Sequence, residues 1–178
     1  TEIGFVISEV DHVLSNIEKW TSPRKVGVPL HQRPGSGRVV PEPLGTVLII
    51  SPWNYPLQLL LAPLVPAIAA GNTAILKPSE IAPATAAVIE DLLLNYLDGR
   101  VVQVVSGGVE KTTELLAEQW DHIFYTGNGT VGKIVMLAAA EHQTPVTLEL
   151  CGKSPAIVTA SADVTVSARR IAWGKCIN

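Results

Sequence analysis

From residue 44 onward the sequence alternates between short apolar runs and longer segments with helical spacing, and few folds accommodate this order. Strands that alternate with helices in this way form βαβ units, whose strands pair into a parallel sheet. The runs Val47–Ile50 and Thr73–Leu76 contain no charged residue, as expected of strands covered on both faces. We therefore predict a doubly wound, Rossmann-like α/β domain over residues 44–178, with helices on both faces of a parallel sheet.

Turn residues and periodicity place the individual elements. Apolar side chains at helical spacing predict a helix over residues 3–20, and the Pro- and Gly-rich residues 21–43 predict extended chain or a strand pair around a Pro-Gly turn. Residues 1–43 are thus expected to form an N-terminal helix and an extended arm. Strands are predicted at 46–51, 72–77, 101–105, 122–126, 145–150 and 156–159, and helices at 56–70, 83–97, 109–119, 129–142 and 163–176, the last with Asp163 as its cap.

Composition excludes several classes of protein. The chain has 13 basic and 16 acidic residues and is 47% hydrophobic, which argues against disorder and against a nucleic-acid-binding surface. The stretch between Glu42 and Lys77 lacks charge, but Pro52, Pro56, Pro63 and Pro66 interrupt it, which favours a buried strand and helix over a membrane span. Two cysteines, without metal-ligand spacing, fit a reducing compartment, and no secretory signal opens the chain. We expect a cytoplasmic protein with no metal site.

Ligands of doubly wound sheets bind at the carboxyl ends of the strands, so the residues after each strand are candidates for function. Asn54 follows the first strand of the domain, where its amide could stabilise an oxyanion or could cap the next helix. Lys77 and Glu80 follow the second strand. They could hold the two hydroxyls of a ribose or form a solvated ion pair on a turn.

A glycine pattern follows the fourth strand of the domain. Residues 127–132 match G-x-G-x-x-G between a strand and a helix, a turn that lets backbone N–H groups approach a phosphate. The match differs from the usual dinucleotide fingerprint because it does not follow the first strand. An acidic strand end is also expected about 20 residues later, and only Glu149 stands near that position.

The end of the strand at 145–150 carries a candidate base. Burial there would raise the pKa of Glu149 and suit it to general-base catalysis, whereas an ion pair with Lys153 or Lys175 is the structural alternative. Cys176 lies on an amphipathic helix, where a buried cysteine behaves as a small hydrophobe, and Cys151 lies in a turn beside a glycine. Neither cysteine has a histidine nearby in sequence, so neither is favoured as a nucleophile.

Taken in order, these loops resemble the aldehyde dehydrogenases. The resemblance runs from about residue 3 to the end, and the versions of the motifs at residues 144–150 and 169–175 resemble the class 3 or fatty aldehyde dehydrogenase branch. The segments that carry it are Pro43-Leu44-Gly45, Pro52-Trp53-Asn54-Tyr55-Pro56, Ala69-Ala70-Gly71-Asn72, Lys77-Pro78-Ser79-Glu80, Phe124-Tyr125-Thr126-Gly127 and Leu148-Glu149-Leu150-x-Gly152-Lys153-Ser154-Pro155.

The resemblance implies oxidation of an aldehyde to a carboxylic acid with NAD or NADP, by way of a cysteine thioester. It implies that Asn54 is the oxyanion-hole amide and that Glu149 is the base that activates the hydrolytic water. It also implies a homodimer for the full-length protein, with medium- or long-chain aliphatic or aromatic aldehydes as substrates. The cofactor-binding residues that it implies are Pro52, Trp53, Lys77, Glu80, Gly127, Asn128, Gly132 and Leu150.

Three departures from the family pattern stand out. Asn128 and Gly129 replace Ser-Thr in the glycine turn, which should alter the phosphate contacts, and Cys151 replaces a glycine. If position 151 requires a positive φ or a close approach of the nicotinamide, its Cβ costs roughly 1–3 kcal/mol. The family nucleophile lies in a Gly-Gln-x-Cys segment, expected a few residues after Asn178.

These features leave two readings of the chain itself. It is a fragment of an aldehyde dehydrogenase that by itself does not turn over aldehyde, or it is a non-catalytic nucleotide-binding or partner-binding remnant of the same fold. A fragment of such a sheet is expected to expose apolar surface and to aggregate. Any membrane association would depend on a C-terminal tail outside these residues. The sequence does not specify the aldehyde or the preference between NAD and NADP.

Overall fold

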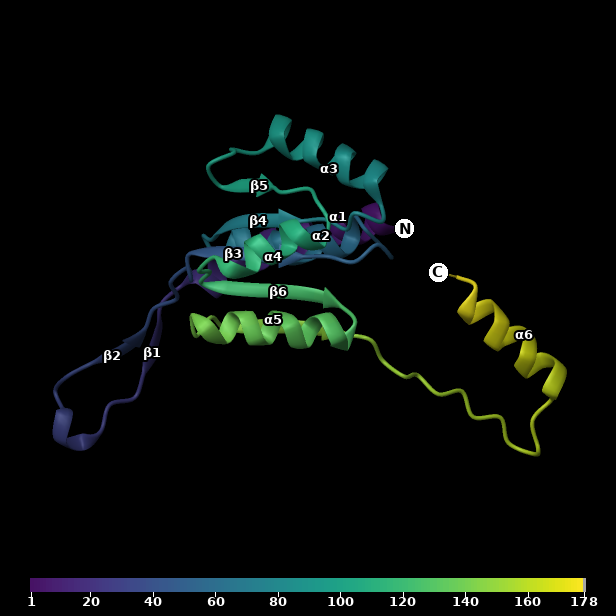
Figure 1. Ribbon diagram of the computed structural model, residues 1–178. Coiled ribbons are helices and arrows are strands. Elements are labelled where there is room, and N and C mark those ends of the chain that lie inside the picture. The colour runs from purple at the N-terminus through teal and green to yellow at the C-terminus, as the bar shows by residue number, and fades with distance from the viewer. Residues whose placement is uncertain (178) are drawn as a thin grey trace.

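A five-stranded parallel sheet forms the centre of the computed structural model, which describes residues 1–177 (Figure 1). The strands lie in the order β5-β4-β3-β6-β7, and every neighbouring pair is parallel. This order confirms the doubly wound sheet. The strands are β3 (Thr46–Ile50), β4 (Thr73–Lys77), β5 (Val102–Val104), β6 (His122–Gly127) and β7 (Val146–Leu150).

Helices cover both faces of the sheet, as the apolar strands predict. The helices α2 (Gln58–Ala69) and α3 (Pro83–Tyr96) pack on one face, and α4 (Val109–Ala117) and α5 (Gly129–Glu141) pack on the other. Along β3, Val47 and Ile49 point into the first core while Leu48 and Ile50 point into the second. A strand with both faces buried has no polar side, which explains its continuous apolar run.

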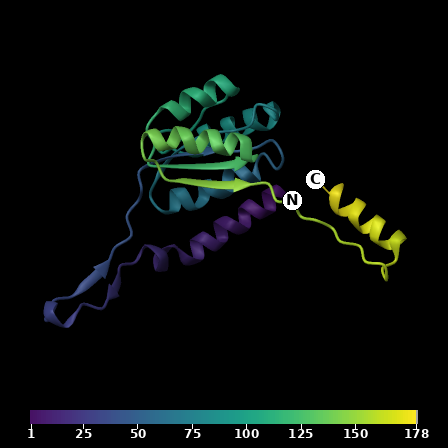
Figure 2. The same ribbon diagram turned by 60° about the horizontal axis from the view of Figure 1, so that its bottom comes forward.

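The N-terminal residues form a helix and a projecting hairpin. Helix α1 (Glu2–Thr21) lies along α2, and the Glu2 carboxylate accepts hydrogen bonds from the backbone N–H groups of Leu57 and Gln58 (Figure 2). Strands β1 (Arg24–Val26) and β2 (Gly37–Val39) pair antiparallel around the short 3₁₀ helix η1 (Leu30–Gln32). The predicted helix and strand pair are therefore confirmed.

The C-terminal residues extend away from the sheet as an exposed segment and helix α6 (Val164–Lys175) (Figures 1 and 2). Asp163 caps this helix as predicted, because its carboxylate accepts from the N–H of Val166 at 2.9 Å. The strand expected at residues 156–159 is wrong, because these residues pair with no strand in the described chain. Cys176 is exposed, so its expected burial is also wrong.

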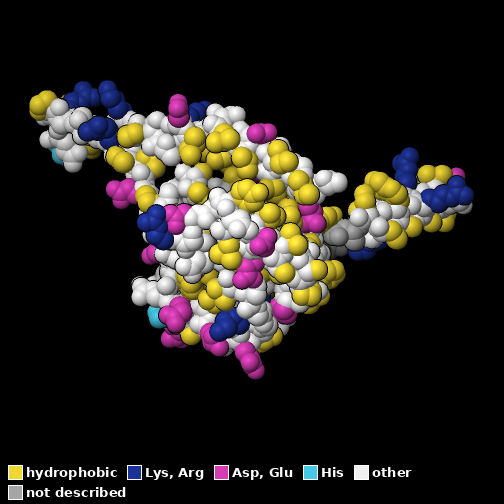
Figure 3. Space-filling model, turned by 90° about the horizontal axis from the view of Figure 1, so that it is seen from above, with side chains coloured by type: hydrophobic (Ala, Val, Ile, Leu, Met, Phe, Trp, Pro, Cys, Tyr) yellow, Lys and Arg dark blue, Asp and Glu magenta, His cyan; other side chains and the backbone are white. Residues whose placement is uncertain are grey.

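The charge-free stretch folds as a strand, a turn and a buried helix. Helix α2 begins at Gln58, two residues later than predicted from Pro56, after Tyr55 adopts a left-handed backbone with φ 55°. No helix within residues 1–177 is long and apolar enough to cross a membrane. Seen from above, Lys and Arg side chains gather on the two projecting ends, and acidic side chains scatter over the body between them (Figure 3).

Candidate functional site

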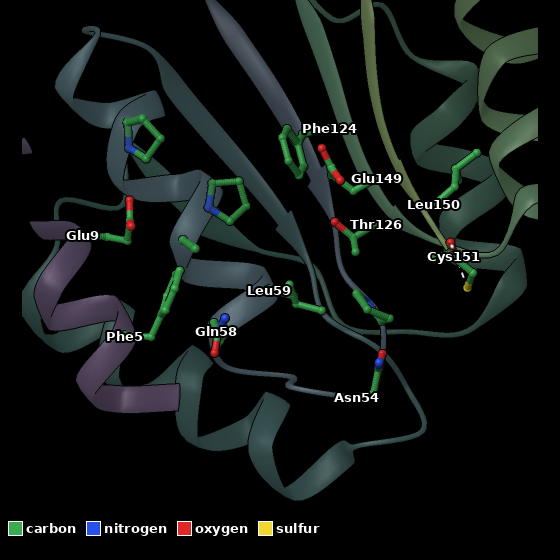
Figure 4. Close-up of a pocket in the computed structure, with 15 residues that line it drawn as sticks. Phe5, Glu9, Asn54, Gln58, Leu59, Phe124, Thr126, Glu149, Leu150 and Cys151 are labelled. Atoms are coloured by element: carbon green, nitrogen blue, oxygen red, sulfur yellow. Dashed lines mark hydrogen bonds between the residues drawn. The ribbon is translucent and has the colours of Figure 1, made fainter. Parts of the chain in front are cut away.

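A cleft of about 590 Å³ opens at the carboxyl ends of β3, β6 and β7 (Figure 4). The chain runs outward from β3 to β4 and β5 and then returns to place β6 on the other side of β3, so the strand order reverses between β3 and β6. Ligands of open α/β sheets bind at such a reversal. The strand ends contribute Pro52, Asn54, Phe124, Thr126, Gly127, Glu149, Leu150 and Cys151, and α1 and α2 contribute Phe5, Glu9, Gln58 and Leu59 among others.

Strand register brings residues far apart in the sequence to this edge. Ile50 of β3 lies opposite Lys77 of β4 and Tyr125 of β6, and Thr126 lies opposite Glu149 of β7. The structure therefore brings Asn54 and Glu149 to one cleft from opposite sides of β6. Both side chains therefore border the same cleft, although they are 95 positions apart in the sequence.

Asn54 lies in the loop between β3 and α2 and lines the cleft, half-buried. The alternative in which it caps the next helix is wrong, because α2 has no cap from that side chain and Glu2 binds its first N–H groups. No hydrogen bond holds the Asn54 amide within residues 1–177, so its N–H groups can donate into the cleft.

Glu149 stands near the end of β7 with its side chain exposed at the cleft, beside Phe124 (Figure 4). The expected burial of this carboxylate is wrong for the described residues, since the last two residues of β7 are exposed. The alternative ion pair is also wrong, because neither Lys153 nor Lys175 approaches it in the described chain. An unpaired carboxylate in a cleft can accept a proton from water.

Lys77 and Glu80 form an ion pair beyond the end of β4. The Lys77 side chain is 3% exposed, and its Nζ donates to Glu80 Oε2 at 3.2 Å and to Pro78 O at 2.7 Å. A hydrogen bond from its own backbone N–H, together with the Lys77 ammonium, holds the pKa of Glu80 below its usual value. The pair therefore consists of a buried ammonium and a half-exposed carboxylate. The alternative of a fully solvated ion pair on a turn is wrong for Lys77.

The glycine turn joins β6 to α5. Asn128 caps the helix by accepting from the N–H of Val131 at 2.9 Å, so its role here is acceptor rather than donor. Gly127 lines the cleft, and a Cβ on it would collide with the hydroxyl of Tyr125. A Cβ on Gly132 would lie 2.9 Å from a methyl carbon of Leu150, so this glycine lets α5 pack against the end of β7.

The remaining predicted residues lie around the cleft with different exposure. Pro52 and Leu150 line it, whereas Trp53 is 58% exposed and is not among the lining residues. Cys151 also lines it, with its thiol 3.8 Å from the carbonyl oxygen of Gly127. Its backbone is not in the left-handed region, so the strain considered for a side chain at this position does not arise.

A second cavity, of about 310 Å³, opens beside Glu80 and was not predicted. Its walls include Ser79, Glu90 of α3 and Ser106, which follows β5. Ser106 follows the end of β5, as the other candidate residues follow the ends of their strands. This position in the sequence could have identified Ser106 as a candidate site residue. Glu90 carries no comparable signal, because it lies within a helix. Within residues 1–177, no three His, Cys, Asp or Glu side chains are grouped to hold a metal ion.

Comparison with known proteins identifies the family. The model of the aldehyde dehydrogenase family matches residues 1–178. The chain belongs to the aldehyde dehydrogenase family. It is 52% identical over 177 residues to aldehyde dehydrogenase family 3 member A2 of Rattus norvegicus, which covers 99% of this chain but 37% of that protein. The chain therefore spans little more than a third of the length of this relative.

Solved aldehyde dehydrogenases share the fold. The Staphylococcus aureus AldH, solved in a substrate-bound state, superposes with a TM-score of 0.91 at 46% identity, over 98% of this chain and 38% of that one. The Mycobacterium tuberculosis aldehyde dehydrogenase complexed with NAD⁺ gives a TM-score of 0.77 at 32% identity, over 90% of this chain and 33% of that one. These comparisons confirm the Rossmann-like domain and the resemblance seen in the sequence.

Aldehyde dehydrogenases use NAD or NADP, and the residues at this sheet edge fit such a group. The buried Lys77 ammonium donates to Pro78 O and to Glu80 and so holds the Glu80 carboxylate in place at this edge. Glu80, half-exposed and ionised, can accept from a hydroxyl. Gly129 and Thr130, the first residues of α5, are exposed, and the N-terminus of a helix favours a phosphate.

Proposed function

We propose that the full-length protein oxidises aldehydes to carboxylic acids with NAD or NADP. The observation that supports this most directly is the meeting of Asn54 and Glu149 in one cleft at the reversal of strand order. The ion pair of Lys77 and Glu80, the helix start after Gly127 and the family relationship add to it. Because the chain spans about a third of its relatives, this activity is a proposal for the whole protein.

In the proposed mechanism Asn54 acts on the carbonyl oxygen. Its side-chain N–H donates to that oxygen as negative charge develops on it during attack by a nucleophile. By resemblance the nucleophile is a cysteine thiolate in a Gly-Gln-x-Cys motif, which does not occur among these 178 residues. Bound NAD or NADP would supply the hydride acceptor that this oxidation needs, and Glu80 and the first turn of α5 would help to hold it.

Glu149 acts in the second half of the reaction. Its carboxylate takes a proton from a water molecule, whose oxygen attacks the thioester carbon, and the cysteine sulfur leaves as a thiolate. The acid product keeps the oxygen of that water. An exposed, unpaired carboxylate on the cleft wall has the open access to water that this step needs.

The test is the substitution Glu149→Gln in the full-length protein. It should preserve a first-turnover burst of reduced cofactor and lower the steady-state rate by about 10²- to 10⁴-fold, because acyl transfer proceeds but hydrolysis lacks its base. The control Glu141→Gln removes a carboxylate of α5 that does not line the cleft and should leave both phases unchanged. An unaltered steady-state rate in Glu149→Gln would exclude the role given to this residue.

The 178-residue chain taken alone is proposed to bind nucleotide without oxidising aldehyde, because it carries the strand-edge residues but not the Gly-Gln-x-Cys motif. Calorimetric titration with NAD and an aldehyde oxidation assay on the same sample test this. Turnover by the chain alone would contradict it and would direct attention to Cys151, the cysteine that lines the cleft.

Finer features of the whole protein follow the same resemblance. The cleft walls carry Phe5, Leu59, Phe124 and Leu150, which suits medium- or long-chain aliphatic or aromatic aldehydes. We also propose a homodimer located in the cytoplasm. Size-exclusion chromatography with light scattering, and fractionation of cells that express the full-length protein, test these two points.

A further inference from the structure

The second cavity carries two carboxylates. Glu80 and Glu90 both line it, and the other lining residues are Pro78, Ser79, Pro83, Ala86, Ala87, Ser106 and Gly107. Within residues 1–177, no Lys, Arg or His is among its lining residues. Glu80 is ionised at neutral pH, as a glutamate whose pKa is not raised must be, so the walls present negative charge to any ligand.

Glu90 is held toward this cavity by a hydrogen bond from a neighbouring strand end. It lies on α3, half-buried, and its Oε2 accepts from the hydroxyl of Ser106 at 2.9 Å. Ser106 follows β5, which is the strand next to β4 and its ion pair. The contact joins two walls of the cavity and fixes the position of the Glu90 carboxylate.

The nearby cations are already paired. Lys77 is buried with its Nζ bonded to Glu80 and to Pro78 O. Lys111 lies beside Gly107, since a Cβ added there would be 2.7 Å from the Lys111 Cβ, but its ammonium pairs with Glu114. Lys77 forms an ion pair with Glu80, one of the two carboxylates that line the cavity. Among the described residues, Glu90 forms no ion pair.

We propose that Glu90 is a specificity-determining residue that, together with Glu80, makes this cavity favour an unphosphorylated ribose and disfavour a ribose 2′-phosphate, so that the protein binds NAD in preference to NADP. The inference rests on the proposed nucleotide function of the Lys77–Glu80 pair. A ribose hydroxyl donates to a carboxylate and is stabilised by it. A phosphate at the same carbon offers no strong donor and brings up to two negative charges toward two carboxylates.

The experiment measures binding rather than turnover. Calorimetry on the full-length protein, without aldehyde and at low salt, gives dissociation constants for NAD and NADP, which differ only in the 2′-phosphate. The wild-type protein should bind NAD at least about tenfold more tightly than NADP. Glu90→Gln should reduce this preference about five- to tenfold by tightening NADP binding, while NAD binding stays within about twofold, because glutamine still accepts from Ser106.

Two further variants sharpen the result. Asp91→Asn removes the neighbouring carboxylate on α3, which does not line the cavity, and should leave the preference unchanged. Ser106→Ala releases Glu90 and should reduce the preference less than Glu90→Gln does. If Glu90→Gln does not fold, Ser106→Ala becomes the test of the inference. An unchanged preference for NAD over NADP in Ser106→Ala would then overturn it.

The outcomes separate this inference from the proposed function. Binding of both nucleotides with an NAD preference that Glu90→Gln leaves unchanged overturns the role of Glu90 alone. Equal or tighter binding of NADP by the wild-type protein also overturns it, and leaves the nucleotide site in place. Absence of binding for both nucleotides overturns the nucleotide site and the inference together.

Discussion

Substitution of Glu80 by glutamine tests the ion pair at the end of β4 through its effect on stability. Glutamine keeps an acceptor for Lys77 but removes the negative charge opposite a side chain that is 3% exposed. Breaking a fully buried pair costs about 3–5 kcal/mol, and exposed pairs are worth about 0.2–1 kcal/mol. Glu80 is 46% exposed and Lys77 keeps its bond to Pro78 O, so we expect a loss of about 1–2 kcal/mol in the free energy of unfolding.

The effect should depend on pH in a defined direction. The pKa of Glu80 is lowered in the folded protein, so the unfolded chain takes up this proton first as the pH falls. The stabilisation is therefore complete above the unfolded pKa of about 4.3 and is lost as the pH falls through the lower folded value. The difference between wild type and Glu80→Gln should be largest at pH 7 and should shrink below about pH 4.5.

Urea unfolding followed by circular dichroism measures this difference. With a slope of about 2 kcal/mol per molar urea, a loss of about 1–2 kcal/mol lowers the midpoint by about 0.5–1 M at pH 7. Glu42→Gln, on the exposed residues before β3, is the matched control and should shift the free energy of unfolding by less than about 0.5 kcal/mol. Equal stability of wild type and Glu80→Gln at pH 7, or a difference that persists unchanged at pH 3.5, would refute the reasoning.

Three further predictions concern stability, each measured by urea unfolding. Gly45→Ala should lose at least about 2 kcal/mol, since Gly45 has φ +132° and a Cβ there would collide with Asp121; a loss below about 0.5 kcal/mol would contradict this. Asn128→Ala should lose about 1 kcal/mol by removing the cap on Val131, whereas Asn128→Asp should be close to neutral. Burial lowers the pKa of His122, so its contribution is complete above about pH 6.5 and is lost as the pH falls. His122→Asn should therefore flatten the decline in stability between pH 7 and pH 5, and an unchanged slope would count against it.

Most elements of the sheet could be predicted because their signals are local. The apolar runs of β3 and β4, the prolines around the arm and the Asp163 cap each act over a few residues, and each prediction is confirmed. The strand at residues 156–159 was wrong for a related reason. Ile157 and Val158 have strand propensity, but a strand also needs a partner, and a partner is a property of the whole fold.

The candidate site was predicted less completely, because its details depend on contacts between distant segments. The start of α2 is bound by Glu2, some 55 residues away, and this contact removed the capping role considered for Asn54. Glu149 is exposed because the last two residues of β7 are left uncovered, and the sequence of a single strand does not show which of its residues other elements will cover. The contact of Glu90 with Ser106 joins a helix to a strand end 16 residues later, and neither residue indicates the other in the sequence.

The sequence by itself determined the order of strands and helices, the two-faced sheet and the polar residues at each strand end, because hydrophobic periodicity and turn chemistry operate over a few neighbouring residues. Only the tertiary structure decided which strand ends lie side by side, which carboxylates are paired or exposed, and that Glu90 shares a cavity with Glu80. Those properties arise from strand order and packing, which bring together residues that the chain holds far apart.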